Sequence, residues 1–131
     1  MRYELFLKRN WDKLKILKFD SRYLNSIRFC PLESFGHRIT KLVICHLLAK
    51  SGHFFATELP INEAKCDIID LSDFIVYEIE ANTNSTIIKK KMDDFRHPFI
   101  EDLMIVDLKK LGLDWTPFYA LKDKISKRFL L

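Results

Sequence analysis

Seven consecutive residues near the middle of the chain, 74–80 (FIVYEIE), constrain the fold more than any other segment. The run is nearly continuous in apolar residues and rich in β-branched and aromatic types, which is typical of a strand buried on both faces. Side chains alternate along a strand, so Val76, Glu78 and Glu80 share one face. The sequence therefore predicts a central strand that ends in two glutamates about 6.6 Å apart on the same side.

Hydrophobic spacing predicts the elements around this strand. From Ser34 onward apolar residues recur at helical intervals until Ser51 and Gly52 provide a stop. The basic and aromatic residues 1–34 leave strand and helix open. The predicted order from Ser34 is α-β-β-β-α-β, a mixed α/β fold with a sheet flanked by helices. The expected elements are a helix at 34–50, strands at 53–61, 65–72 and 74–80, a helix at 86–97, a strand at 102–108 and a terminal helix at 117–131.

Length and composition exclude several classes of protein. The 131 residues, 48% hydrophobic and 31% charged, suit one globular domain and argue against disorder. No apolar run approaches the ~20 residues that span a bilayer, so no membrane association is expected. Three cysteines without CxxC spacing argue against a disulfide framework or structural zinc. We therefore expect a cytoplasmic protein, or one in the host cell interior if it is viral.

Charge is segregated along the chain. Residues 58–80 hold seven acids and one base, a net charge of −6. Because the whole chain has a net charge of +4, the remaining residues together carry +10. A basic body around an acidic centre suits a protein that binds polyanions and holds a cation in its middle. The simpler alternative is a solvated acidic loop on a basic protein.

Asp67 is expected to join the two strand glutamates. It opens the strand before Glu78, and a tight hairpin between the two strands places it beside Glu78 and Glu80. Carboxylates this close repel each other by up to ~4 kcal/mol per pair at 4 Å, so a proton or a divalent cation must offset the charge. Oxygen ligands without fixed His or Cys partners favour Mg²⁺ or Mn²⁺ over zinc.

The order α-β-β-β-α-β, with Asp67 opening the second strand and Glu78-Ile79-Glu80 ending the third, resembles the core of the PD-(D/E)XK nuclease superfamily. That superfamily includes restriction enzymes and Holliday-junction resolvases, and the resemblance covers residues 35–111, about 60% of the chain. It implies a restriction-endonuclease-like core and Mg²⁺-dependent cleavage of DNA, as an endonuclease or junction resolvase. It further implies that Asp67 and Glu78 hold the metal.

Glu80 departs from the superfamily pattern, which has lysine at this position. The resemblance implies that Glu80 is a third metal ligand or positions a water molecule. It also implies that a lysine of the following helix, Lys89, Lys90 or Lys91, takes the missing catalytic role. These three lysines are also expected to contact nucleic acid, whereas the alternative is a solvated helix face.

Four residues around the predicted helix 34–50 and the first strand complete the candidate site. Glu33 and Glu58 are candidate metal ligands; for Glu33 the alternative is an acid that stabilises the helix start. His37 and Arg38, in the first turn of the helix, are candidate nucleic-acid contacts, although His37 could simply be exposed.

The sequence divides into a basic N-terminal extension (1–34), a core (35–111) and a C-terminal helix (112–131) within a single nuclease-like domain. A homodimer is expected, because cutting a duplex or a junction needs two symmetric sites. Two other functions stay open: a catalytically inactive nucleic-acid-binding protein on the same fold, and a structural or partner-binding protein with an acidic patch. Abundant Ile, Lys and Phe suit an archaeal or viral origin.

Overall fold

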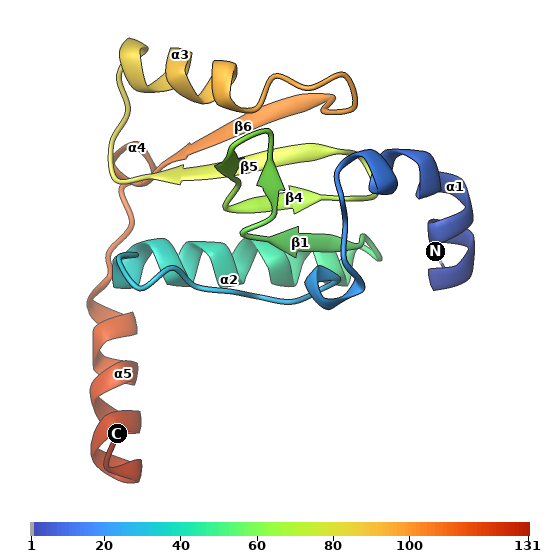
Figure 1. The fold of residues 1–131 in the computed structure, drawn as a ribbon. Coiled ribbons are helices and arrows are strands. Elements are labelled where there is room, and N and C mark those ends of the chain that lie inside the picture. The colour runs from blue at the N-terminus through green and yellow to red at the C-terminus, as the bar shows by residue number, and fades with distance from the viewer. Residues whose placement is uncertain (1) are drawn as a thin grey trace.

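A four-stranded mixed sheet forms the centre of the computed structural model, which describes residues 2–131 (Figure 1). The strand order is β1-β4-β5-β6; β1 pairs with β4 and β4 with β5 antiparallel, whereas β5 and β6 run parallel. A separate two-stranded ribbon pairs β2 with β3. The strands are β1 (Phe55–Thr57), β2 (Pro60–Ile61), β3 (Ala64–Lys65), β4 (Ile68–Asp70), β5 (Ile75–Glu80) and β6 (Asp102–Asp107).

Helices lie on both faces of the sheet, and they confirm the predicted mixed α/β class. Helix α2 packs on one face, where Cys45 and Leu48 contact Ile68 and Ile79. Helix α1 packs on the other face, the side on which α3 also lies. The helices are α1 (Tyr3–Ile16), α2 (Phe35–Lys50), α3 (Ser85–Asp94), α4 (Leu108–Leu111) and α5 (Thr116–Phe129), with a 3-10 turn η1 at Ser21–Tyr23.

Helix α2 has the ends that the sequence predicts. The Ser34 hydroxyl accepts the N–H of His37 and so caps the first turn, and the helix ends at Lys50. Gly52 follows with a φ of +76°, a conformation that glycine adopts at little cost. These residues fix the position of the helix start, where several candidate residues lie.

The faces of β5 are those that alternation predicts. Val76 belongs to the core on the α1 side, whereas Ile79 belongs to the core under α2. Glu78 and Glu80 therefore point to the α1 and α3 side of the sheet. β5 is an interior strand of the sheet, because β4 pairs with it on one side and β6 on the other.

The segment 53–61, expected as one strand, is broken. β1 ends at Thr57 because Glu58 adopts a left-handed backbone with a φ of +55°. The chain then forms the β2–β3 ribbon, whose turn contains Asn62, also at positive φ. The pattern of apolar residues did not predict this break, because the break depends on the backbone conformation of a single residue, Glu58.

Residues 3–16, for which the sequence left strand and helix open, form α1. Phe6, Asn10 and Leu14 are buried at intervals of four residues, and Phe6 and Leu14 enter the main core. The basic N-terminal segment is thus an integral layer over the sheet.

The chain leaves β6 through α4 and reaches α5, which projects from the body of the protein (Figure 1). Trp115, at the start of α5, packs on Gly36 in the first turn of α2, where a Cβ atom would lie 3.3 Å from the indole ring. No helix within residues 2–131 is long and apolar enough to cross a membrane.

Candidate functional site

Asp67 and Glu78 lie side by side at the end of the β4–β5 hairpin. Ile68 pairs with Tyr77 in the antiparallel register, so the preceding residue, Asp67, lies next to Glu78. The Asp67 N–H donates to Glu78 Oε2 at 2.6 Å, and the Ile79 N–H donates to Asp67 Oδ2 at 2.8 Å. The hairpin thus brings together the two carboxylates that the sequence placed in one site.

Lys91 reaches this pair from α3. Its Nζ lies 2.8 Å from Glu78 Oε1 and 3.3 Å from Glu80 Oε1. The Glu78 side chain is nearly inaccessible to solvent, whereas Lys91 and Glu80 are each about one quarter exposed. Lys91 is therefore the lysine of the 89–91 run that the structure places in the acidic cluster.

The other predicted nucleic-acid contacts lie outside the cluster. Lys89 is exposed on α3, and Lys90 pairs with Asp94 of the same helix at 2.7 Å. Arg38 turns its guanidinium toward the preceding loop, where Nη2 donates to the Cys30 carbonyl at 3.2 Å. Lys89 and Lys90 are both exposed to solvent, whereas Arg38 is partly buried.

Three polar residues at four-residue intervals, Glu33, His37 and Lys41, face the sheet from the start of α2. His37 Nε2 lies 3.2 Å from Asp67 Oδ1 and 3.9 Å from Glu33 Oε1. The contact with Asp67 is an ion pair and lacks the alignment of a hydrogen bond. Through His37, the start of α2 is joined to the carboxylates of the sheet.

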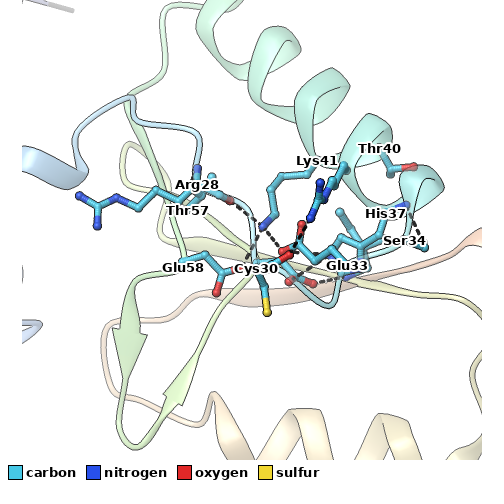
Figure 2. A network of polar contacts seen from close by, with 12 residues as sticks. Arg28, Cys30, Glu33, Ser34, His37, Thr40, Lys41, Thr57 and Glu58 are labelled. Atoms are coloured by element: carbon cyan, nitrogen blue, oxygen red, sulfur yellow. Dashed lines mark hydrogen bonds and ion pairs between the residues drawn. The ribbon is translucent and has the colours of Figure 1, made fainter. Parts of the chain in front are cut away.

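Lys41 is fully buried at the centre of this network (Figure 2). Its Nζ donates to Glu33 Oε1 at 2.6 Å, to Glu58 Oε1 at 2.8 Å and to the Arg28 carbonyl at 2.9 Å. All three N–H groups of the ammonium thus have acceptors. Lys41 holds Glu33 and Glu58 in fixed positions and has no access to an external ligand.

Glu33, His37 and Asp67 form a group with the geometry of a metal site, since one ligand atom from each lies within 4.8 Å of the other two. The Glu33 side chain is 5% exposed, and its Oε2 is buried without a hydrogen-bond partner among residues 2–131. A buried carboxylate oxygen without a donor is costly, and a bound cation would remove that cost. Glu58, Glu78 and Glu80 instead contact lysines.

Glu78 has a strongly shifted acidity. Burial and the neighbouring charge of Asp67 raise the pKa of Glu78 to about 7, although Lys91 opposes the shift. Glu78 consequently holds a proton through much of the mildly acidic range. A cation that approached it would compete with that proton.

Asp67 and His37 shift each other in the opposite sense. Burial favours the neutral form of Asp67, but His37 and the Ile79 N–H outweigh burial and lower the pKa of Asp67. Burial likewise disfavours charged His37, but the nearby Asp67 and Glu33 carboxylates raise the pKa of His37. Asp67 is therefore ionised at neutral pH and able to serve as a ligand.

These contacts form one continuous polar network with an excess of negative charge. Lys91 joins two of the glutamates, Asp67 and His37 bridge to α2, and Lys41 joins the other two. Carboxylates outnumber lysines by five to two, which suits the recruitment of a cation. The members are Glu33, His37, Lys41, Glu58, Asp67, Glu78, Glu80 and Lys91.

The sequence analysis did not identify Lys41. The residue lies in an apolar stretch of α2, where a lysine can be taken for a solvated side chain. The signal was its spacing: His37 and Lys41 are four residues apart and so share one helix face, and Glu33 lies just before the helix in the same register. A polar stripe on the face of a helix that also carries the buried Cys45 and Leu48 points inward.

Comparison with known proteins provides no further assignment: no protein family, no curated protein and no solved structure matches this chain. The function must be inferred from the geometry of the polar network itself.

Proposed function

We propose that this chain is a divalent-metal-dependent nuclease that hydrolyses phosphodiester bonds in DNA. The observation that carries the proposal is the convergence of five carboxylates, with Lys91 and His37, at one end of the central sheet. The strand order β1-β4-β5-β6, with its first three strands antiparallel and its last pair parallel, supports the proposed restriction-endonuclease-like core.

The residues present fit a divalent ion. Glu33, His37 and Asp67 offer two carboxylates and an imidazole, and Glu33 Oε2 has no other partner. When bound there, such an ion supplies a water molecule of lowered pKa and positive charge for a phosphate oxygen. Imidazole is a poor ligand for Mg²⁺ and a better one for transition metals, so the mixed set favours Mn²⁺ over Mg²⁺.

The other members of the network have positioning and electrostatic roles. Lys41 fixes Glu33 so that one oxygen is held by the ammonium and the other is free. Lys91 keeps positive charge beside Glu78 and Glu80, where it can stabilise a phosphate that becomes more negative during cleavage. Glu80 restrains Lys91 and takes the place of a lysine on the strand.

DNA is the proposed substrate because polyanion binding suits the basic remainder of the chain, which carries +10 outside residues 58–80. Lys89 is exposed on α3, the helix that also carries Lys91, and is a proposed phosphate contact. The homodimer expected from the sequence remains a prediction.

A second candidate function is a catalytically inactive nucleic-acid-binding protein on the same fold. The specific observation in its favour is that four of the five carboxylates already have a lysine partner: Lys41 holds Glu33 and Glu58, and Lys91 holds Glu78 and Glu80. A network neutralised to this extent has a smaller requirement for a metal ion.

The two functions are separated by measuring Mn²⁺ binding and DNA cleavage together. We expect the wild-type protein to bind Mn²⁺, followed by electron paramagnetic resonance, and to cut at least one of duplex, junction, flap or single-stranded DNA with Mn²⁺. Asp67→Asn should lose both properties. The inactive alternative predicts salt-sensitive DNA binding without cleavage, and a wild-type protein that neither binds Mn²⁺ nor cuts any substrate would exclude the nuclease.

A further inference from the structure

Helix α5 presents an apolar stripe that its own chain leaves uncovered. Phe118, Leu121, Ile125 and Phe129 recur at intervals of three and four residues and share one face of the helix. Leu121, Ile125 and Phe129 are 57%, 43% and 65% exposed, and no residue of α5 is buried. A helix of 14 residues with little tertiary packing is marginal in water, so a partner surface would stabilise α5.

The outer face of α2 is apolar and exposed as well. The side of α2 that faces away from the sheet carries Leu42, Val43 and Leu47, which are 45%, 45% and 55% exposed. The same helix buries Cys45 and Leu48 on its inner side. An amphipathic helix at the surface of a protein usually exposes polar residues on the outer side, and α2 exposes large aliphatic ones.

The start of α2 and the apolar stripe of α5 face each other across a groove whose lining reaches Ile125 and Leu131. A groove of about 410 Å³ lies between the helices, and Phe35 and Ile39 are its only lining residues from α2. Phe35 packs on Tyr119 with ring centres 4.9 Å apart, so the base of α5 is held at the start of α2. From there α5 runs away from α2 (Figure 1), and Leu42, Val43 and Leu47 stay uncovered by it.

We propose that the outer face of α2 and the apolar stripe of α5 together dock on the same surface of a second copy of this chain. In this two-fold arrangement α5 of one protomer lies along α2 of its partner, and the reverse contact is identical. The two helices suit this exchange, because 16 residues of α2 and 14 of α5 extend about 24 Å and 21 Å. The surface is α2 residues Phe35, Ile39, Leu42, Val43 and Leu47 with α5 residues Phe118, Leu121, Ile125 and Phe129.

The apolar area of this surface approaches what a dimer needs. The six most exposed side chains of this surface, at roughly 90 Å² each, bury on the order of 1,100 Å² across two copies. Stable interfaces begin at about 1,200 Å² in total, and the intervening atoms of both helices supply the remainder. The basic residue Lys127 lies on the side of α5 opposite the stripe and remains in solvent.

The first test is the mass of the protein in solution, measured by light scattering and sedimentation at tens of micromolar. We expect a dimer for the wild type and a folded monomer for Val43→Asp and for Ile125→Asp. Met104→Asp is the matched control, because Met104 is 45% exposed, like Val43, but lies on the edge strand β6. A monomeric wild type would overturn the proposal, as would a dimer that only Met104→Asp disrupts.

The second test identifies which helices meet. In a Cys30→Ser background, a Val43→Cys protein is mixed with an Ile125→Cys protein and oxidised. A crosslinked heterodimer is expected, because α2 of one chain then contacts α5 of the other. A doubly substituted chain that closes the bond within itself would show that α5 folds back on its own α2, and would overturn the proposal. Neither test requires cleavage activity, so failure here leaves the proposed nuclease untouched.

Discussion

Lys91 Nζ on α3 lies 2.8 Å from Glu78 Oε1 on β5. The helix after the strand thus places a lysine beside Glu78 and Glu80, the two acids of the strand. The strand ends in two acids and the helix supplies the compensating charge. In the proposed nuclease, Lys91 is the cation that would act on a phosphate beside Glu78.

Substitution of Lys91 tests this arrangement. Lys91→Met should lower the rate of Mn²⁺-dependent cleavage by about 10²-fold, because a preorganised positive charge is lost from the site. Lys91→Arg should retain part of the activity. Lys89→Met is the comparison on the same helix: its cleavage rate at saturating DNA should stay within a few-fold of wild type, whereas its DNA affinity should fall, because Lys89 is a proposed phosphate contact. Equal losses of cleavage rate in Lys91→Met and Lys89→Met would show that the lysines at 89–91 act only through their total charge.

Asp67 should be needed for metal binding more than for folding. Asp67→Asn keeps an oxygen that can accept the Ile79 N–H but removes the negative charge. We expect Mn²⁺ affinity to fall by more than about tenfold, with the free energy of unfolding changed by about 1 kcal/mol or less. Asp93→Asn, on an exposed acid of α3, should leave Mn²⁺ affinity unchanged. Unaltered Mn²⁺ binding by Asp67→Asn would remove Asp67 from the ligand set.

The metal-free protein should lose stability as pH rises from about 4.5 to 7. In the unfolded chain Glu78 ionises near pH 4.5, whereas in the folded protein it keeps its proton until about pH 7, a difference of about 3 kcal/mol. His37 acts in the same sense, because its raised pKa contributes stability below pH 6.5 that is lost as pH rises through the folded value.

Urea unfolding with EDTA between pH 5 and 8 measures this dependence. The slope should be smaller in Glu78→Gln, which does not titrate. A wild-type protein that becomes more stable between pH 5 and 8, or a Glu78→Gln variant with the full slope, would contradict the assignment.

Lys41 should be one of the most sensitive positions for stability. Lys41→Met leaves Glu33 and Glu58 without their buried partner and should cost about 3–5 kcal/mol in unfolding free energy. Adding Glu58→Gln to this variant removes one uncompensated charge and should restore part of the loss. Lys50→Met, at the exposed end of the same helix, should have little effect. A neutral Lys41→Met would mean that Lys41 is not the structural centre of the network.

The sequence predicted those parts of the fold that depend on local periodicity. The alternation in residues 74–80 predicted which face carries Glu78 and Glu80. The helical spacing of apolar residues from Ser34 onward and the stop at Ser51 and Gly52 predicted α2. Glu58 was the failure: its left-handed backbone divides one expected strand into β1 and the start of a ribbon. Local pattern carries little information about a single positive φ at a glutamate.

The site was predicted to a similar extent. Asp67 next to Glu78 follows from hairpin register, and a lysine of the 89–91 run was expected at the acids, but the register of α3 against the sheet was needed to select Lys91. Lys41 was missed because its importance depends on Glu33 and Glu58. Those two residues lie 8 and 17 positions away in the chain and meet only through tertiary packing.

The bond from the Ile79 N–H to Asp67 Oδ2 ties the end of the sheet to the chemistry of the site. When the end of the β4–β5 hairpin frays, this bond breaks and the Asp67 carboxylate is displaced at the same time. The free energy of opening this hairpin end is therefore also the free energy of displacing Asp67. Amide hydrogen exchange at Ile79 therefore reports directly on how often Asp67 leaves its place. Any ligand that fixes Asp67 should slow exchange at this amide, even where the global stability of the protein hardly changes.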